Sequence, residues 1–157
     1  GLINNASHLL NLFEFLLGKL IKCELLKNYS LKSKSPNFLA IFEYGHVVFQ
    51  SLDIFPYSDI SFELNCANGK LKYENFGWNI KWHSVVGDKE FEKYKIIDQD
   101  FIQINNQMYK YQYNVLNMIA EEFKENKSSL CTGQQALATI RTLNKLNREF
   151  ENWIKIN

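Results

Sequence analysis

Histidine is the side chain best suited to move protons near neutral pH, and the chain holds three of them. His46 follows a glycine in a predicted hairpin and His83 lies in a predicted strand, so we interpret both as solvated or structural. His8 lies in the first turn of a predicted helix, four residues after Asn4, and such side chains share one face of a helix. An uncharged imidazole there would act as a general acid or base, or bind a hydroxyl group. We therefore take His8 and Asn4 as candidate catalytic residues, with a structural role for His8 as the alternative.

Other self-contained catalytic machinery is missing from the sequence. It has no G-x-G-x-x-G segment after a strand, no Walker loop, no H-E-x-x-H and no G-x-S-x-G. Cys23, Cys66 and Cys131 lie far apart and include no C-x-x-C pair, so we expect buried or idle thiols and no metal site.

A predicted helix near the start of the chain positions the two candidate residues. Asn4 or Asn5 would cap it and Gly18 would end it. Its apolar residues recur every three or four positions and predict one buried stripe: Leu9, Leu12, Phe13, Leu16, Leu17 and Leu20.

The middle of the chain changes to a period of two, which indicates strands. We expect six or seven, mainly antiparallel because the links are short. One hairpin should turn at Tyr44-Gly45 and another at Asn68-Gly69, where a type I′ turn would need positive φ at both central residues. The expected strands are 21–25, 38–42, 47–54, 60–64, 70–75, 78–82 and, after a turn at Gly87-Asp88, 91–97.

The last third predicts two helices. The first has an apolar stripe: Met108, Tyr111, Val115, Met118, Ile119 and Phe123. The second opens at Thr132 with the capping box Thr-Gly-Gln-Gln, in which the side chains of Thr132 and Gln135 satisfy free backbone donors. Its expected buried face is Ala136, Leu137, Ile140, Leu143, Leu146, Phe150 and Trp153.

This order of elements predicts the α+β class, as a single domain over 1–157 with an open-faced, mainly antiparallel β-sheet and helices packed on one face. The predicted sheet has apolar residues that cannot all point at three helices: Phe49, Leu52, Tyr73, Trp78, Ile80 and Trp82. We therefore expect the second sheet face to join copies into a homodimer or homotetramer, with cover by strand twist and loops as the alternative. The net charge is +1 and the lysines form no basic stripe, so we expect no nucleic-acid partner. No apolar run approaches the ~20 residues of a membrane span and no signal peptide is recognisable, so a cytoplasmic protein is expected.

Four stretches together resemble a known family. Asn4–Leu12 followed by Phe15–Gly18 is similar to D-x-G-x-H-x-x-D-L…L-G, and residues 37–47 to a strand pair around a glycine turn. Residues 62–71 are similar to E-(I/L)-x-G-x-x-G-x-(L/I), and residues 132–141 to a last helix G-x-x-A-L-x-x-(L/I)-(R/x). In this order, over essentially the whole chain, they resemble the C-terminal domain of the Gfo/Idh/MocA family, the glucose–fructose oxidoreductase and inositol dehydrogenase group.

The resemblance implies an N-terminal Rossmann domain, absent from this chain, that binds NAD or NADP and supplies the lysine of a Glu-Lys-Pro motif. This chain, beginning at Gly1, would be the C-terminal part, which binds a sugar or nucleotide sugar and forms the oligomer interface. Alone it would bind no cofactor and be inactive. In the family an Asp and a His four residues apart assist proton transfer; His8 falls on that His, Asn4 on the Asp and Ala6 on a Gly.

Asn4 departs from the family pattern, because an amide carries no charge to stabilise an imidazolium. In an unrelated Ser-His-Asp triad the same change costs about 10⁴ in rate. Three interpretations stay open: His8 binds a hydroxyl without shuttling protons, the substrate is not the usual polyol, or the protein is a degenerate member. Asn11, where the family often has Asp, also makes the site less acidic.

The alternative function is a non-enzymatic interaction module that binds a partner on its aromatic sheet face.

Overall fold

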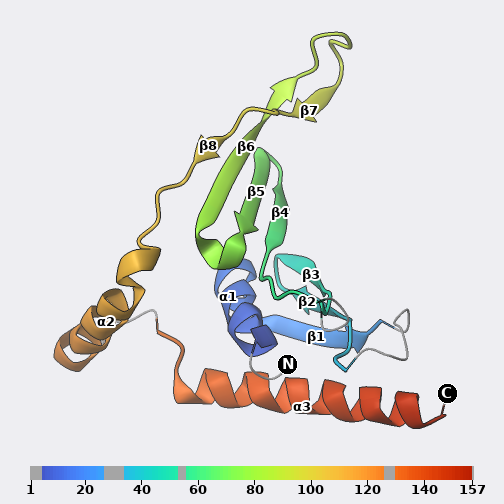
Figure 1. Ribbon diagram of the computed structural model, residues 1–157, viewed down its shortest axis with the longest axis vertical. Coiled ribbons are helices and arrows are strands. Elements are labelled where there is room, and N and C mark those ends of the chain that lie inside the picture. The colour runs from blue at the N-terminus through green and yellow to red at the C-terminus, as the bar shows by residue number, and fades with distance from the viewer. Residues whose placement is uncertain (1–4, 27–33, 53–55, 126–129, 157) are drawn as a thin grey trace. The chain divides into compact units, whose positions relative to one another are not determined.

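The computed structural model describes residues 5–26, 34–52, 56–125 and 130–156. The chain divides into two compact units, whose elements are labelled in Figure 1, and the single domain expected over 1–157 stays a prediction. Unit 1 comprises residues 1–58 and 129–157, and unit 2, residues 59–128, is inserted between its two parts.

Unit 1 is a three-stranded antiparallel sheet with two helices. Its helices are α1 (Ser7–Leu17) and α3 (Gly133–Ile156), and its strands are β1 (Leu20–Leu25), β2 (Phe38–Phe42) and β3 (Gly45–Phe49), in the order β1-β2-β3. The β2–β3 hairpin turns at Glu43 and Tyr44, which confirms the hairpin predicted there, although β3 ends at Phe49 instead of residue 54.

One aromatic cluster forms the centre of the unit 1 core. Every second residue of β2 is buried, so Phe38, Ala40 and Phe42 share one face. Phe38 stacks on Phe49 with ring centroids 4.4 Å apart, and Phe13 of α1 meets Phe49 edge-on at 5.8 Å. Such aromatic pairs add ~0.5–1.5 kcal/mol to the burial of their surface.

Helix α1 differs from its prediction at its N-terminal end. The residue at its N-cap is Ala6, with no side-chain cap, because Asn5 and Ala6 already wind as a π-helical turn. Asn5 as the cap is therefore wrong, and Asn4 lies outside the described residues. Phe13 is buried as expected, but the other buried position is Leu10, whereas Leu9 and Leu12 of the expected stripe are only half-buried.

The C-terminal end of α1 is as predicted, since Gly18 ends the helix with φ +79°. The hairpin turn packs there: the Tyr44 amide donates to the Leu17 carbonyl at 2.9 Å. A Cβ on Gly18 would lie 3.0 Å from Glu43 and Tyr44 side-chain atoms, so both the turn geometry and the space favour glycine.

Helix α3 begins with the predicted capping box. The Thr132 amide donates to Gln135 Oε1 at 2.8 Å, and the Gln135 amide donates to Thr132 Oγ1 at 3.2 Å. Leu143, Leu146 and Phe150 are buried as expected, whereas Leu137 is exposed.

Unit 2 contains a second antiparallel sheet. Its strands are β4 (Phe62–Cys66), β5 (Gly69–Glu74), β6 (Asn79–Gly87), β7 (Lys95–Ile97) and β8 (Ile102–Gln103). The order is β4-β5-β6-β7, and β8 also pairs with β6. The expected strand 91–97 shortens to β7, because residues 88–94 form the turn. The α+β class with antiparallel strands is confirmed, but the strands form two sheets.

The hairpin near Asn68 is confirmed, but its type is wrong. The two turn residues are Ala67 and Asn68, and neither Asn68 nor Gly69 has positive φ. Gly69 already pairs with Cys66 and lies beneath Trp82: a Cβ on it would be 2.3 Å from Trp82 Cζ2 and 2.5 Å from the His83 carbonyl oxygen. The glycine is required for close packing rather than for the turn.

Left-handed backbone occurs instead in the next connection, η2 (Asn75–Gly77), where φ is +50°, +56° and +91° in succession. A Cβ on Gly77 would lie 2.5 Å from the Tyr73 hydroxyl oxygen. This turn carries the sharp reversal from β5 into β6.

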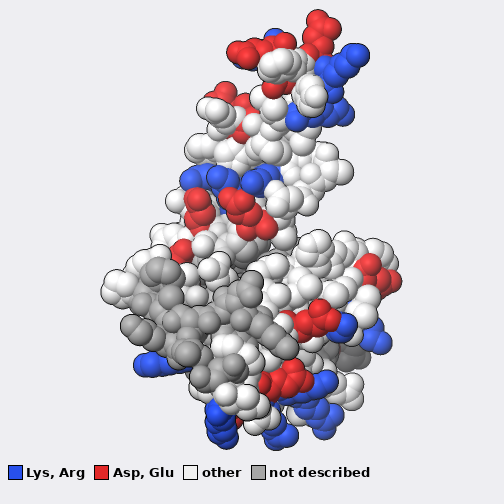
Figure 2. Space-filling view, turned by 90° about the vertical axis from the view of Figure 1, so that its right-hand side faces the viewer, with Lys and Arg blue, Asp and Glu red and all other residues white. Residues whose placement is uncertain are grey.

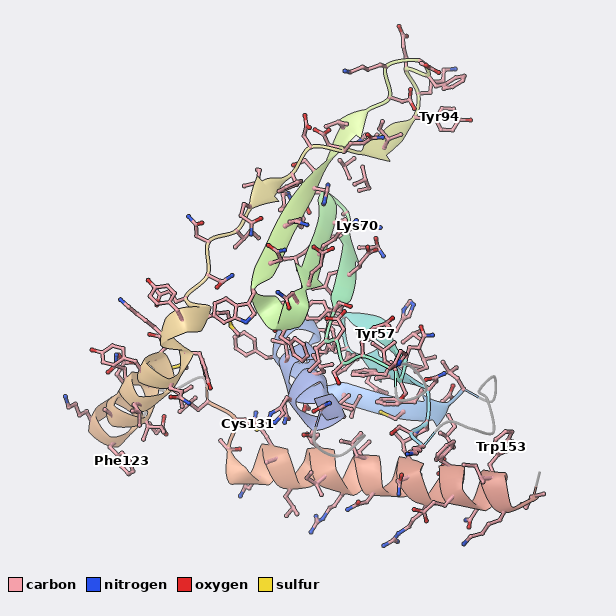
Figure 3. All side chains as sticks on the ribbon, viewed as in Figure 1. Tyr57, Lys70, Tyr94, Phe123, Cys131 and Trp153 are labelled. Carbon is pink, nitrogen blue, oxygen red and sulfur yellow. The ribbon has the colours of Figure 1, made fainter. Side chains whose placement is uncertain are left out.

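The last element of unit 2 is α2 (Tyr111–Glu125), which continues from the short turn η3 (Met108–Lys110). The helix is as predicted, but its apolar stripe is not buried. Val115 is 42%, Ile119 38% and Phe123 86% exposed. Figure 3 shows Phe123 projecting away from the helix.

Candidate functional site

His8, the candidate catalytic residue, is the second residue of α1 and is exposed. No hydrogen bond or ion pair joins its side chain to another described residue. Its imidazole is therefore open to a ligand. Its predicted partner Asn4 lies outside the described residues, so the pairing of the two side chains stays a prediction.

Asn11, one turn further along α1, has a structural partner. Its Oδ1 accepts a hydrogen bond of 2.8 Å from Thr139 Oγ1 of α3, 128 residues away in sequence. Thr139 is only 3% exposed, so this bond satisfies a buried hydroxyl between two helices. Sequence reasoning missed Thr139; the available signal was a hydroxyl among the apolar residues of the last helix.

The other two histidines are placed as the sequence indicates. His46 is exposed on β3. His83 Nδ1 lies 3.0 Å from the Asp98 carbonyl oxygen, which makes Nδ1 the donor in the neutral ring, and the imidazole lies 5.7 Å from the Phe101 ring. His83 thus ties β6 to the segment after β7.

The cysteines are free thiols. Cys66 and Cys131 are exposed, whereas partial burial raises the pKa of Cys23 in β1 to about 11. Across the described ranges, no three His, Cys, Asp or Glu side chains are grouped so that they could hold a metal ion.

The unit 2 sheet has one charged face. Lys70 Nζ lies 2.9 Å from Glu63 Oε2, and Lys81 Nζ lies 2.7 Å from Glu74 Oε2 across the β5–β6 pair. The bond from Lys70 is the main cause that lowers the pKa of Glu63. Figure 2 shows lysine and acidic atoms side by side on the view it draws, and Lys70 is labelled in Figure 3. Paired charges of this kind suit a face in water.

The opposite face of the same sheet is apolar. Cross-strand pairing places alternate residues of β4, β5 and β6 together, since Leu64 pairs with Leu71, Leu71 with Trp82, and Tyr73 with Ile80. Ile102 of β8 pairs with Trp82 and extends this face. We name it the apolar sheet face: Leu64, Cys66, Leu71, Tyr73, Ile80, Trp82, Val86 and Ile102.

Within the described part of unit 2, no helix packs on the apolar sheet face. Among the described residues of unit 2, only Gly69 and Gly77 are buried, so none of its large side chains is. Ile102 is 64% exposed. A sheet of this size normally gains its stability by burying one face. The apolar sheet face is therefore a candidate interaction surface.

The chain was compared with family models, with curated proteins and with solved structures, and none of the three comparisons finds a match. Within the described segments, no helix is both long and apolar enough to cross a membrane.

Proposed function

We propose that the chain is the substrate-binding and oligomerisation domain of a cytoplasmic NAD(P)-dependent oxidoreductase that acts on a sugar or nucleotide sugar. The observation that carries the proposal is the apolar sheet face, on which no described helix of unit 2 packs. The order of elements supports it too, because a helix bearing an exposed His8, antiparallel hairpins and a capped last helix follow the order of the resembling motifs.

Self-association follows from the cost of leaving that face in water. Burying apolar surface is worth ~25 cal/mol per Å², and exposed patches beyond a few hundred Å² mark interaction sites. A second copy offers apolar surface of the same kind, and in a two-fold symmetric dimer each copy can cover the sheet face of the other. The charged face of the sheet has its ion pairs satisfied and needs no partner.

Substrate contact would fall to the N-terminal end of α1. The exposed His8 imidazole has one donor and one acceptor nitrogen, which suit a sugar hydroxyl. The described residues do not fit a dinucleotide, because all their strand pairs are antiparallel and no glycine-rich loop links a strand to a helix. We therefore place NAD or NADP on a separate domain and derive no step through it.

Two adjacent residues of β8 test the assembly. Ile102 belongs to the apolar sheet face and Gln103, paired with Lys81, to the charged face. Sedimentation should give a dimer or tetramer for the wild type and for Gln103→Glu, and a monomer for Ile102→Glu. A monomeric wild type at high concentration would refute assembly through this face.

The enzymatic part has its own test. The gene should encode a G-x-G-x-x-G strand–helix unit and a Glu-Lys-Pro motif before Gly1; an unrelated domain there would overturn it. Saturation-transfer NMR with UDP-glucose and with myo-inositol should detect binding of one of them, weakened by His8→Ala.

The second candidate is a non-enzymatic interaction module. It is supported by the apolar sheet face alone, because an apolar surface of this kind would equally bind a protein partner. Assembly without binding of either sugar would support this module over the oxidoreductase domain.

A further inference from the structure

Unit 2 carries a second apolar surface besides the apolar sheet face. On α2 the residues Val115, Leu116, Ile119 and Phe123 follow helical spacing and are 42%, 65%, 38% and 86% exposed. We name them the α2 stripe. Asn117 and Glu121 lie on the opposite side of the helix, so α2 is two-sided like the sheet.

We propose that α2 is exchanged between two copies of this chain, with the α2 stripe of each copy packed on the apolar sheet face of the other. The proposal rests on the self-association proposed above and names what covers the sheet. Exchange of an identical element is a common route to symmetric dimers.

Chemical matching supports this occupant. The apolar sheet face includes no charged side chain, so it favours an apolar partner of the kind the α2 stripe provides. Direct packing of sheet on sheet would leave both α2 stripes in water. Exchange covers the sheet and the helix of both copies in one arrangement.

The connection from the sheet to α2 is tied by hydrogen bonds that direct the helix. The Ile104 amide donates to the Ile80 carbonyl at 2.9 Å. Asn106 Nδ2 donates to the Gly77 carbonyl at 3.1 Å, and Asn106 Oδ1 accepts from the Met108 amide at 3.0 Å. Because η3 then continues directly into α2, these bonds fix the connection that sets the direction in which the helix leaves the sheet.

The dimensions agree with a stable dimer. A helix of 15 residues is ~22 Å long and ~10 Å wide, which gives a footprint of about 220 Å². Each contact buries a helix surface and a sheet surface, and the dimer has two such contacts, so the flat buried area is about 900 Å² in total. The corrugation of the side chains raises this buried area towards the ~1,200 Å² of specific interfaces. Nine residues of β6 span ~30 Å, so the sheet is long enough to receive the helix.

The natural Cys66 on the apolar sheet face makes the exchange measurable. One full-length chain keeps Cys66 and carries Cys23→Ala and Cys131→Ser. A second chain with a longer tag carries those changes plus Cys66→Ser and Ile119→Cys. In the matched control, Asn117→Cys on the far side of α2 replaces Ile119→Cys. Mixed chains are refolded together, oxidised gently and run on a non-reducing gel.

The expected result is a mixed-tag disulfide for Ile119→Cys, at least ten times stronger than for Asn117→Cys. A dimer in sedimentation without this preference overturns the exchange but leaves assembly through the sheet standing. A monomer overturns both. A single chain holding Cys66 and Ile119→Cys that forms a fast-migrating internal disulfide, independent of concentration, also overturns the exchange, because α2 then covers its own sheet.

Discussion

Gly69→Ala tests the close packing of β5 against β6. The new methyl group would lie 2.3 Å from Trp82 Cζ2 and 2.5 Å from the His83 carbonyl oxygen, where ordinary contacts are 3.4–4 Å. The indole could swing aside, but the carbonyl belongs to the backbone of β6. The strand pair must therefore separate locally by about 1 Å, an overpacking that costs ~1–3 kcal/mol.

A gain partly offsets this cost, because replacing glycine restricts the unfolded chain and is worth ~0.4–1 kcal/mol. The net loss in free energy of unfolding should be about 1–2 kcal/mol. Gly87→Ala is the matched control in the same sheet: no atom lies within 4 Å of its added Cβ and its φ is not positive, so only the small gain applies.

The assay is urea unfolding followed by tryptophan emission in a Trp153→Phe background, so that Trp78 and Trp82 of unit 2 report. Gly69→Ala should lower the midpoint at unchanged slope and shift the emission of the native state, while Gly87→Ala leaves the native emission unchanged. Equal midpoints for the two variants would show that Trp82 does not lie against Gly69.

Three shorter predictions concern unit 1. Thr139→Val should lower the free energy of unfolding by about 1–2 kcal/mol, because the Asn11 amide oxygen loses its hydrogen-bond donor. Thr139→Ser keeps a hydroxyl and should retain more stability, and equal losses for the two variants in thermal unfolding would contradict the hydrogen bond. Thr132→Ala should cost about 1 kcal/mol by removing the α3 cap, and Thr132→Ser should recover most of it in the same measurement. Cys23 should react with iodoacetamide at pH 9 much more slowly than the exposed Cys131, because burial raises the pKa of Cys23 to about 11 and shields its sulfur. The same burial favours the neutral thiol, so stability should also fall as pH rises from 9 to 11, and equal alkylation rates would refute this.

The sequence was informative where local chemistry decides the structure. The capping box at Thr132 and the stop at Gly18 depend on residues a few positions apart, and both are confirmed. Both hairpins were predicted at the right place in the sequence, but the turn type at Asn68 was predicted wrongly. The glycine at position 69 is needed because Trp82 of another strand packs against it. The periodicity of a sequence carries no information about such a contact between strands.

Tertiary contacts explain the remaining differences. The stripe on α2 has the spacing of a buried face, and spacing alone does not say whether its partner belongs to the same chain. Thr139 is buried because Asn11 lies opposite it, a pairing that spans most of the chain. For the candidate site, the sequence located His8 in the first turn of a helix, whereas its pairing with Asn4 stays a prediction.

The insertion of unit 2 into unit 1 affects how the protein is made. Helix α1 and strands β1 to β3 leave the ribosome before unit 2, whereas the residues of α3 that complete their core leave it only after unit 2. At ~5–20 residues per second, synthesis of the intervening residues 59–128 takes roughly 4–14 s. During that time Leu10, Phe13 and the aromatic face of β2 stay in water, so nascent chains should depend on a chaperone that holds apolar segments until the C-terminal helix emerges.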